Sequence, residues 1–132
     1  MRTRVLGCVL FLAAAAAPAA AEDVPVTYTE AQAIEGAEVF LTNCARCHGI
    51  DLKGDFGPPL IGPPWDVHWR GGYARELFAF IRTNMPNDFP GTLAPWDYVA
   101  AMAFVLKANG IPAGTEPLTP MIPRNAVIPD YP

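Results

Sequence analysis

The sequence predicts a small all-α domain, and three observations lead to that prediction. Apolar residues recur at helical spacing in three segments, at about 30–44, 74–83 and 95–106. No segment alternates polar and apolar residues as a strand does, and no internal repeat is present. The 132 residues include 11 Gly and 15 Pro, which gather mainly between the predicted helices. A domain this small and this rich in Gly and Pro often depends on a metal, disulfides or a cofactor.

The first 21 residues have the features of a secretory signal peptide. Arg2 and Arg4 precede an apolar run over 5–17, and small residues follow at 19–21. The run is too short to cross a bilayer. Its removal would leave seven basic and thirteen acidic residues, a formal charge of −6. We therefore expect an exported, periplasmic protein with no transmembrane anchor in its mature form and no affinity for nucleic acid.

The first helix of the mature chain is predicted from about Glu30 into Cys44. The residues before it, 22–29, are expected to form a flexible start. Apolar residues on one face of the helix follow three- and four-residue spacing. They are Ala33, Ile34, Ala37, Phe40 and Leu41.

Two further helices are predicted after an irregular, Gly- and Pro-rich loop over 49–65. A short amphipathic helix is expected over 74–83, where apolar residues recur at helical spacing. Pro86 prevents this helix from continuing. Pro95 stands at the first position of the last helix, and Gly110 ends it. The three helices and their loops predict one folded domain.

This domain is expected over 30–114, followed by an extended tail over 115–132. The segment 111–132 holds six prolines, which disfavour helices and central strands. The chain is expected to be a monomer.

The strongest motif is Cys-Ala-Arg-Cys-His over residues 44–48, the spacing of a c-type haem attachment site. Two thiols on one helical turn reach two vinyl groups on adjacent pyrrole rings. His48 then presents its imidazole to the iron as the proximal ligand. The third cysteine, Cys8, lies within the predicted signal. We therefore predict one haem c, bound covalently through Cys44 and Cys47.

Three other interpretations of these residues are open. A redox-active dithiol typically follows a strand, whereas a helix is predicted before Cys44. A zinc site needs four ligands, and His68 is the available fourth ligand. A simple disulfide between Cys44 and Cys47 gives His48 no role.

A haem iron in an electron carrier needs a sixth ligand, and Met85 is the best candidate. It precedes Pro86, which ends a helix and holds the residue before it extended, so that the thioether is presented from a loop. Met121, His68 or an open position are the alternatives. Met102 lies within the last predicted helix and is expected to fill the core.

These residues together resemble the class I c-type cytochromes, small monohaem proteins with three main helices around the haem and long Gly- and Pro-rich loops. The resemblance extends over about 30–114. The features that carry it are Gly36, Phe40, the motif at 44–48, Gly57-Pro58-Pro59-Leu60, Met85-Pro86 and Phe104.

The resemblance implies roles for several of these residues. Gly36 allows the last helix to cross the first closely near Phe104, because Gly has no Cβ. The carbonyl of Pro58 accepts the Nδ1 proton of His48 and so fixes its tautomer. Leu60 belongs to the residues that bind the haem.

The stretch 65–114 is similar, more narrowly, to cytochromes that accompany periplasmic quinoprotein dehydrogenases. The shared pattern is a Trp before a Gly-rich turn, a helix, a Met-Pro loop, Pro-Gly-x-Leu, a Tyr-led helix and Asn-Gly before a proline. This resemblance implies a quinoprotein dehydrogenase as electron donor and a downstream cytochrome or terminal oxidase as acceptor.

The haem propionates need polar partners, and Trp69 and Arg70 are the candidates. They precede the second predicted helix and carry an indole N–H and a guanidinium. The alternative is an aromatic cover over the core beside an ordinary surface arginine.

Ligation of both axial positions leaves no place for a substrate, so the predicted function is one-electron transfer rather than catalysis. One alternative is a haem enzyme or small-ligand sensor with a displaceable distal ligand. Another is a fixed cytochrome subunit of a dehydrogenase complex, with the tail as its tether.

Overall fold

The computed structural model describes residues 20–130, and within them it contains five helices and one pair of two-residue strands. The predicted all-α class is therefore confirmed. The predicted signal segment, 1–21, lies almost entirely outside the described residues, and so does Cys8. No helix in the described part of the chain is long and apolar enough to cross a membrane. The elements are β1 (Val24–Pro25), α1 (Glu30–Asn43), α2 (Ala45–His48), α3 (Pro63–Trp69), α4 (Ala74–Asn84), α5 (Pro95–Ala108) and β2 (Ala126–Val127).

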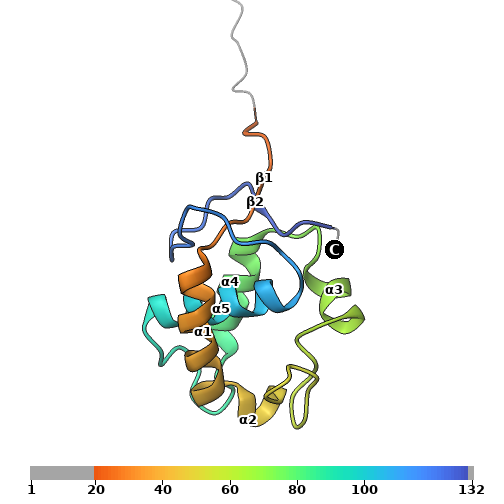
Figure 1. Cartoon of the computed structure of the whole chain (residues 1–132), viewed down its shortest axis with the longest axis vertical. Helices are drawn as coiled ribbons and strands as arrows, with labels where there is room; N and C mark the ends of the chain where they lie inside the picture. Colours follow the sequence, from red (N-terminus) through yellow and green to blue (C-terminus); the bar gives the residue numbers. More distant parts are fainter. Residues whose placement is uncertain (1–19, 131–132) are drawn as a thin grey trace, which may run out of the picture.

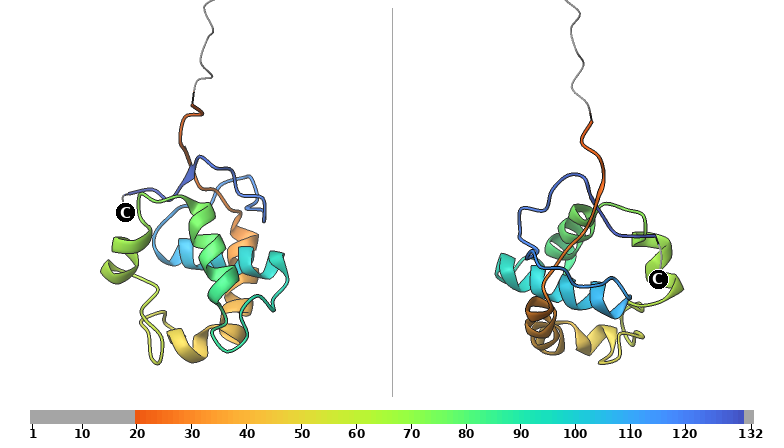
Figure 2. Two further views of the ribbon diagram at one scale, coloured as in Figure 1. Left: turned by 180° about the vertical axis from the view of Figure 1, so that it is seen from behind. Right: turned by 45° about the horizontal axis from the view of Figure 1, so that its top comes forward.

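Two crossing helices, α1 and α5, form the centre of the molecule (Figure 1). α4 packs against α5, whereas α3 stands to one side. α2 lies at one end of the molecule, and β1 and β2 pair in parallel at the other. Figure 2 shows the same arrangement from two further directions. Eight of the 14 residues of α5 are buried, so this helix supplies much of the core.

α1 begins and ends almost as predicted. Thr29 caps it through a reciprocal pair of hydrogen bonds: its hydroxyl accepts from the backbone N–H of Gln32 (3.2 Å), and its own N–H donates to the Gln32 side chain (3.1 Å). At the other end, the N–H of Cys44 donates to the carbonyl of Phe40 (2.8 Å). The helix therefore delivers the chain directly to the first cysteine of the motif.

The crossing of α1 over α5 depends on Gly36. A Cβ at this position would lie 1.8 Å from the carbonyl oxygen of Ala100 and 3.0 Å from the Cβ of Phe104. The ring of Phe104 packs on that of Phe40, with the centroids 5.2 Å apart. The close crossing expected between Gly36 and Phe104 is therefore present, with the backbone of Ala100 as the nearest contact.

α4 and α5 also lie where the sequence predicted them. α5 begins at Pro95 and ends just before Gly110, whose φ of 79° suits a residue without a Cβ. α4 runs one residue past its predicted end and stops at Met85, whose backbone is extended (φ −123°, ψ 152°). This is the conformation that Pro86 imposes on the residue before it.

The structure corrects the predicted loop over 49–65, because its last residues belong to α3. Pro63 stands at the start of this helix, where its missing N–H costs nothing, and Trp65 is 2% exposed. Seven residues that include two prolines are too few to show helical periodicity. α2 and α3 are thus two short helices beyond the three main ones predicted, and His68 lies on a helix rather than in a loop.

The structure also corrects the expectation of a flexible start over 22–29, and it shows contacts of the predicted tail over 115–132 with that segment. β1 and β2 pair with each other, and the N–H of Val26 donates to the carbonyl of Val127 (2.7 Å). The tail is extended, as its prolines predict, but it packs on the domain. The pairing joins residues about 100 positions apart, and short local patterns do not reveal such partners.

Tyr28 shows how firmly these two segments are held. Its side chain and that of Ile128 are fully buried, and its hydroxyl donates to the carbonyl of Ile111 (2.5 Å). Burial, with a smaller contribution from the charge of Glu30, raises the pKa of Tyr28 to about 12. The neutral phenol is therefore a structural part of the domain at physiological pH.

We expect Gly36→Ala to destabilise the protein, although Ala favours helices by about 1 kcal/mol over Gly. The added Cβ meets the Ala100 carbonyl, so α1 and α5 must move apart. Overpacking of this kind costs about 1–3 kcal/mol. Urea unfolding followed by circular dichroism measures the change, and Glu35→Ala, at an exposed neighbouring position of α1, is the control. Equal or greater stability of the Gly36→Ala variant would contradict the role assigned to this crossing.

Candidate functional site

The haem motif folds as the junction of α1 and α2. The backbone N–H groups of Cys47 and His48 both donate to the carbonyl of Cys44, at 3.1 and 3.0 Å. One helical turn therefore carries both thiols and the imidazole. Neither cysteine forms a disulfide, and both are half-buried. The motif thus lies within one local turn, as the spacing predicted.

The thiol of Cys44 is not tuned for redox exchange. Burial, and to a lesser extent the neighbouring Cys47, raises the pKa of Cys44 to about 11. A redox-active dithiol instead needs a lowered pKa, because the thiolate is the reactive form. This environment favours a thiol held for attachment over a dithiol that cycles between oxidation states.

His48 has one nitrogen engaged and one left for a metal. The imidazole is 7% exposed, and its Nδ1 lies 2.8 Å from the carbonyl oxygen of Pro58. A carbonyl only accepts hydrogen bonds, so Nδ1 is the donor and Nε2 keeps its lone pair for a metal. A Cβ on Gly57 would lie 3.0 Å from the imidazole, so glycine permits this approach. The contact implied by the family resemblance is present.

Asn109, at the end of α5, holds the loop that carries Pro58 and Leu60. Its side chain is 7% exposed; the amide donates to the carbonyl of Leu60 (2.8 Å) and accepts from the N–H of Gly62 (3.3 Å). In the sequence, Asn109 is part of an Asn-Gly pattern before a proline, and no hydrogen bonds were predicted for its side chain. Its partners lie nearly 50 positions away, so no local signal identifies them.

Tyr98, near the start of α5, holds the backbone of Met85. Its hydroxyl donates to the carbonyl of Met85 (2.7 Å) and accepts from the N–H of Leu93 (3.4 Å). The N–H of Gly91 also donates to the Met85 carbonyl (3.3 Å). Tyr98 is 1% exposed, and a buried tyrosine hydroxyl requires a partner. This contact was not predicted from the sequence, although the need of a buried tyrosine hydroxyl for a partner could have indicated it.

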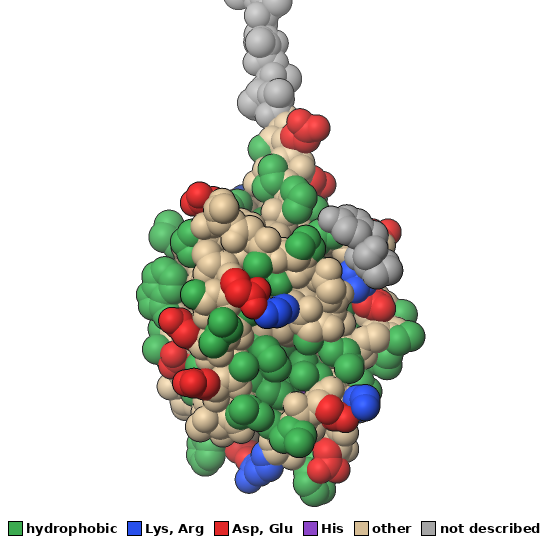
Figure 3. Space-filling model, in the orientation of Figure 1, with side chains coloured by type: hydrophobic (Ala, Val, Ile, Leu, Met, Phe, Trp, Pro, Cys, Tyr) green, Lys and Arg blue, Asp and Glu red, His purple; other side chains and the backbone are tan. Residues whose placement is uncertain are grey.

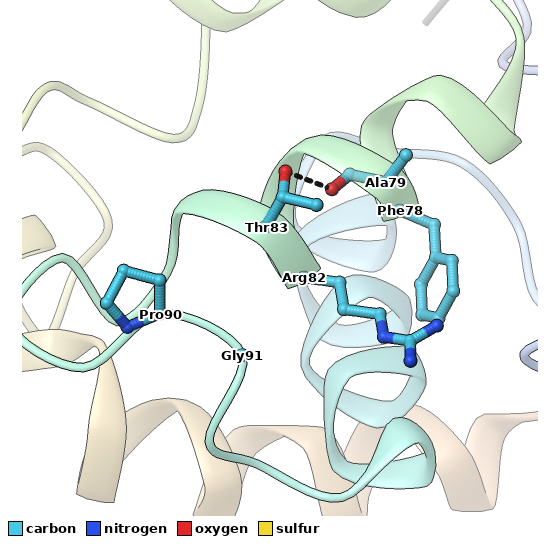
Figure 4. Close-up of a pocket in the computed structure, with 6 residues that line it drawn as sticks. All are labelled: Phe78, Ala79, Arg82, Thr83, Pro90 and Gly91. Carbon is cyan, nitrogen blue, oxygen red and sulfur yellow. Dashed lines mark hydrogen bonds between the residues drawn. The ribbon is translucent and has the colours of Figure 1, made fainter.

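An open hollow of about 480 Å³ borders the loop that follows Met85 (Figure 4). Residues of α4, among them Phe78 and Arg82, form one side, and Pro90 and Gly91 form the other. Thr83 closes the lining and donates from its hydroxyl to the carbonyl of Ala79 (2.7 Å). The loop is therefore accessible from outside the domain.

The other candidates for a sixth ligand lie in less suitable places. Met102 is fully buried in α5, where it fills the core as predicted. Met121 is 88% exposed and belongs to the segment 111–130, at the end of the molecule opposite α2 (Figure 1). His68 is exposed on α3. Met85 alone is half-buried in a loop held by α5.

Trp69 and Arg70 differ in the hydrogen bonds that their polar groups form with the protein. The ring of Trp69 packs on that of Phe80, with the centroids 5.4 Å apart, and no described residue accepts a hydrogen bond from its indole N–H. Arg70 donates to Asp66 (2.6 Å) and to the carbonyl of Asn109 (2.6 Å). Its guanidinium thus supports the fold, and its role toward a propionate stays a prediction.

The residues present fit a haem c. Two unpaired thiols and an imidazole with a free Nε2 share one turn, and half-buried apolar side chains come from several elements around the core. Among residues 20–130, no group of three or more His, Cys, Asp or Glu could hold another metal ion, which disfavours a zinc site. The half-buried apolar residues that pack on the core include Leu60, Ile61, Trp69, Ile81, Leu93 and Phe104.

Comparison of the sequence with known proteins finds cytochromes. Residues 31–105 match the family described as "Cytochrome C oxidase, cbb3-type, subunit III". Over 61 residues the chain is 41% identical to "Cytochrome c-551" of Bacillus subtilis (strain 168), which covers 45% of this chain and 51% of that protein.

A similar solved structure is a chain of the sulfane dehydrogenase SoxCD from Paracoccus pantotrophus. The TM-score is 0.54 at 28% sequence identity, and the match covers 71% of this chain and 54% of that chain. This chain therefore spans about half the length of each of the two relatives. Since the family match covers more than half of the chain and includes the Cys-x-x-Cys-His turn, the protein belongs to the cytochrome c family, as a class I monohaem c-type cytochrome.

Proposed function

We propose that the protein carries single electrons on one haem c, bound covalently through Cys44 and Cys47 and ligated by His48 Nε2 and the Met85 sulfur. When bound, the haem supplies a ferric/ferrous couple. The observation that carries the proposal is the hydrogen bond from His48 Nδ1 to Pro58 on the turn that bears both thiols. It orients the imidazole and leaves Nε2 as the ligand.

The arrangement around Met85 supports its role as the distal ligand. Pro86 keeps the residue extended, and Tyr98 fixes its carbonyl, so the thioether is presented from a restrained loop. Thioether ligation raises the reduction potential above that of two imidazoles. With both axial positions taken by protein side chains, no open coordination position is left for a substrate.

We further propose that the mature protein is periplasmic and accepts electrons from a quinoprotein dehydrogenase. The features of residues 1–21 support export, and the pattern over 65–114 supports the donor. A downstream cytochrome or terminal oxidase is the proposed acceptor. The matched family is described by an oxidase subunit, and the similar SoxCD structure is titled a dehydrogenase, so both relatives come from redox systems.

Exposed apolar side chains on the loops that follow Met85 and His48 favour docking through apolar contacts. Phe89 is 70% exposed, and Ile50 and Phe56, in the loop after His48, are 78% and 86% exposed. Figure 3 shows apolar side chains among scattered charges on one face, rather than a patch of a single sign. Such a surface suits a transient redox partner.

A second candidate function is a fixed subunit of a dehydrogenase complex. The observation that favours it is the likeness to a chain of SoxCD, a structure titled as a dehydrogenase. The tail is not available as a free tether, because β2 is paired with β1. Size-exclusion chromatography of the protein from its native periplasm distinguishes the two: a carrier elutes as a monomer, and a subunit elutes with its enzyme.

We expect the double variant Cys44→Ala/Cys47→Ala to lose covalent haem entirely, because both thioether bonds need these thiols. Each single variant retains one bond. Haem staining of a denaturing gel measures attachment, and Cys8→Ala, in the predicted signal, is the control that keeps full staining. Covalent haem in the double variant would contradict the assignment.

Met85→Ala should abolish the sulfur-to-iron charge-transfer band of the oxidised protein, lower the reduction potential and allow imidazole to bind. The reason is that, among residues 20–130, Met85 is the one methionine that is half-buried outside a helix. Visible spectroscopy and redox titration measure these effects. Met102→Leu and Met121→Leu are the matched controls, and loss of the band in Met121→Leu with retention in Met85→Ala would identify Met121 as the ligand.

The rate of association with a quinoprotein dehydrogenase should change little with salt, because the docking surface is mainly apolar. Stopped-flow oxidation of the enzyme by the ferric cytochrome, at several ionic strengths, measures it. A loss of rate of about tenfold or more between low and physiological salt would indicate charge steering instead.

A further inference from the structure

One ion pair joins the two sides of the haem site. Arg46 lies between the two cysteines on α2, and its guanidinium pairs with the carboxylate of Asp88, 42 positions later, in the loop that follows Met85. Figure 2 shows α2 and this loop at the same end of the molecule. The pair therefore connects the attachment motif, which provides the proximal ligand, to the loop of the proposed distal ligand.

The rest of the loop is held differently. Its backbone bonds are internal: the N–H of Phe89 donates to Pro86 (2.9 Å), and that of Gly91 to Met85 (3.3 Å). Tyr98 fastens the loop to α5. Among residues 20–130, the Arg46–Asp88 pair is the one hydrogen bond or ion pair between this loop and α2. Movement of the loop away from α2 must therefore break this pair.

We propose that Arg46 and Asp88 are positioning residues that keep the Met85 loop closed against α2 and so resist displacement of Met85 by outside ligands. The inference rests on the proposed ligation by Met85. If Met85 holds the iron, an outside ligand would have to displace its thioether, and opening of the loop that carries Met85 would favour that displacement. The Arg46 and Asp88 side chains are 76% and 53% exposed, so salt weakens the pair. The tightness of Met85 ligation therefore depends on ionic strength.

The test is the affinity of imidazole for the ferric holoprotein at low and high salt. At low salt Asp88→Asn, which keeps the shape of the side chain and removes its charge, should bind imidazole about two- to fivefold more tightly, the range of an exposed ion pair. Arg46→Gln should have the same effect. The double variant should match either single variant, because each change breaks the same pair. High salt should bring the wild-type protein to the level of the variants.

The matched control is Asp51→Asn. It breaks the Lys53–Asp51 pair, which is equally exposed at 72% and 54% but lies within one loop and does not connect the two sides. Its imidazole affinity should equal that of the wild type. Arg46 lies within the attachment motif, so its substitution could prevent haem uptake. In that case Asp88→Asn alone provides the test.

The outcomes separate this inference from the function on which it rests. Absence of the charge-transfer band in the wild type would mean that Met85 is not the ligand. That result would overturn the proposed ligation, and with it the inference that depends on it. If the band is present and Asp88→Asn binds imidazole no more tightly than Asp51→Asn, the positioning role is overturned. Effects of Arg46→Gln and Asp88→Asn that add in the double variant would overturn it as well.

Discussion

The close approach of α1 and α5 at Gly36 places every part of the haem site relative to the others. The end of α1 leads directly into the turn with Cys44, Cys47 and His48. The two ends of α5 hold two loops beside this turn: Tyr98 holds the loop of Met85, the proposed distal ligand, and Asn109 holds the loop that carries Pro58. A side chain at Gly36 would separate these helices and thus the two halves of the site. The helix crossing thus positions the candidate haem site, and the loops pack around it.

The loops around the site contain many Gly and Pro residues, which limit regular backbone pairing. Buried backbone groups need hydrogen-bond partners nonetheless. Here single buried polar side chains supply them, because Tyr98 and Asn109 bond to backbone atoms on both sides of the cofactor site, and Arg70 bonds to the carbonyls of Asn109 and Pro129. These side chains replace the secondary structure that the loops lack. They also explain how a domain of this size keeps long irregular segments in fixed positions.

Local patterns in the sequence were enough to predict the three long helices and the haem motif. α1, α4 and α5 follow apolar periodicity and the positions of Pro and Gly, and the spacing of Cys44, Cys47 and His48 carries its chemistry within one turn. Contacts between distant positions were not predictable in this way. The pairing of β1 with β2 joins segments of two residues each, α3 is too short to show a period, and Asn109 bonds to a loop nearly 50 positions away. The contact of His48 with Pro58 came from the family resemblance, since nothing in their spacing specifies it.

The pairing of β1 with β2 has a consequence for how the molecule faces its surroundings. Both strands lie at the end of the domain opposite α2, and there the N-terminal end of the described chain leaves the molecule, whereas its C-terminal end lies beside α3 (Figure 1). A tether attached to the N-terminal end of the described chain, from an electrode, a bead or another domain, would hold the protein with the Cys44–His48 turn pointing away from the support. The fold thus places this end of the described chain and the proposed site of electron exchange at opposite ends of the molecule.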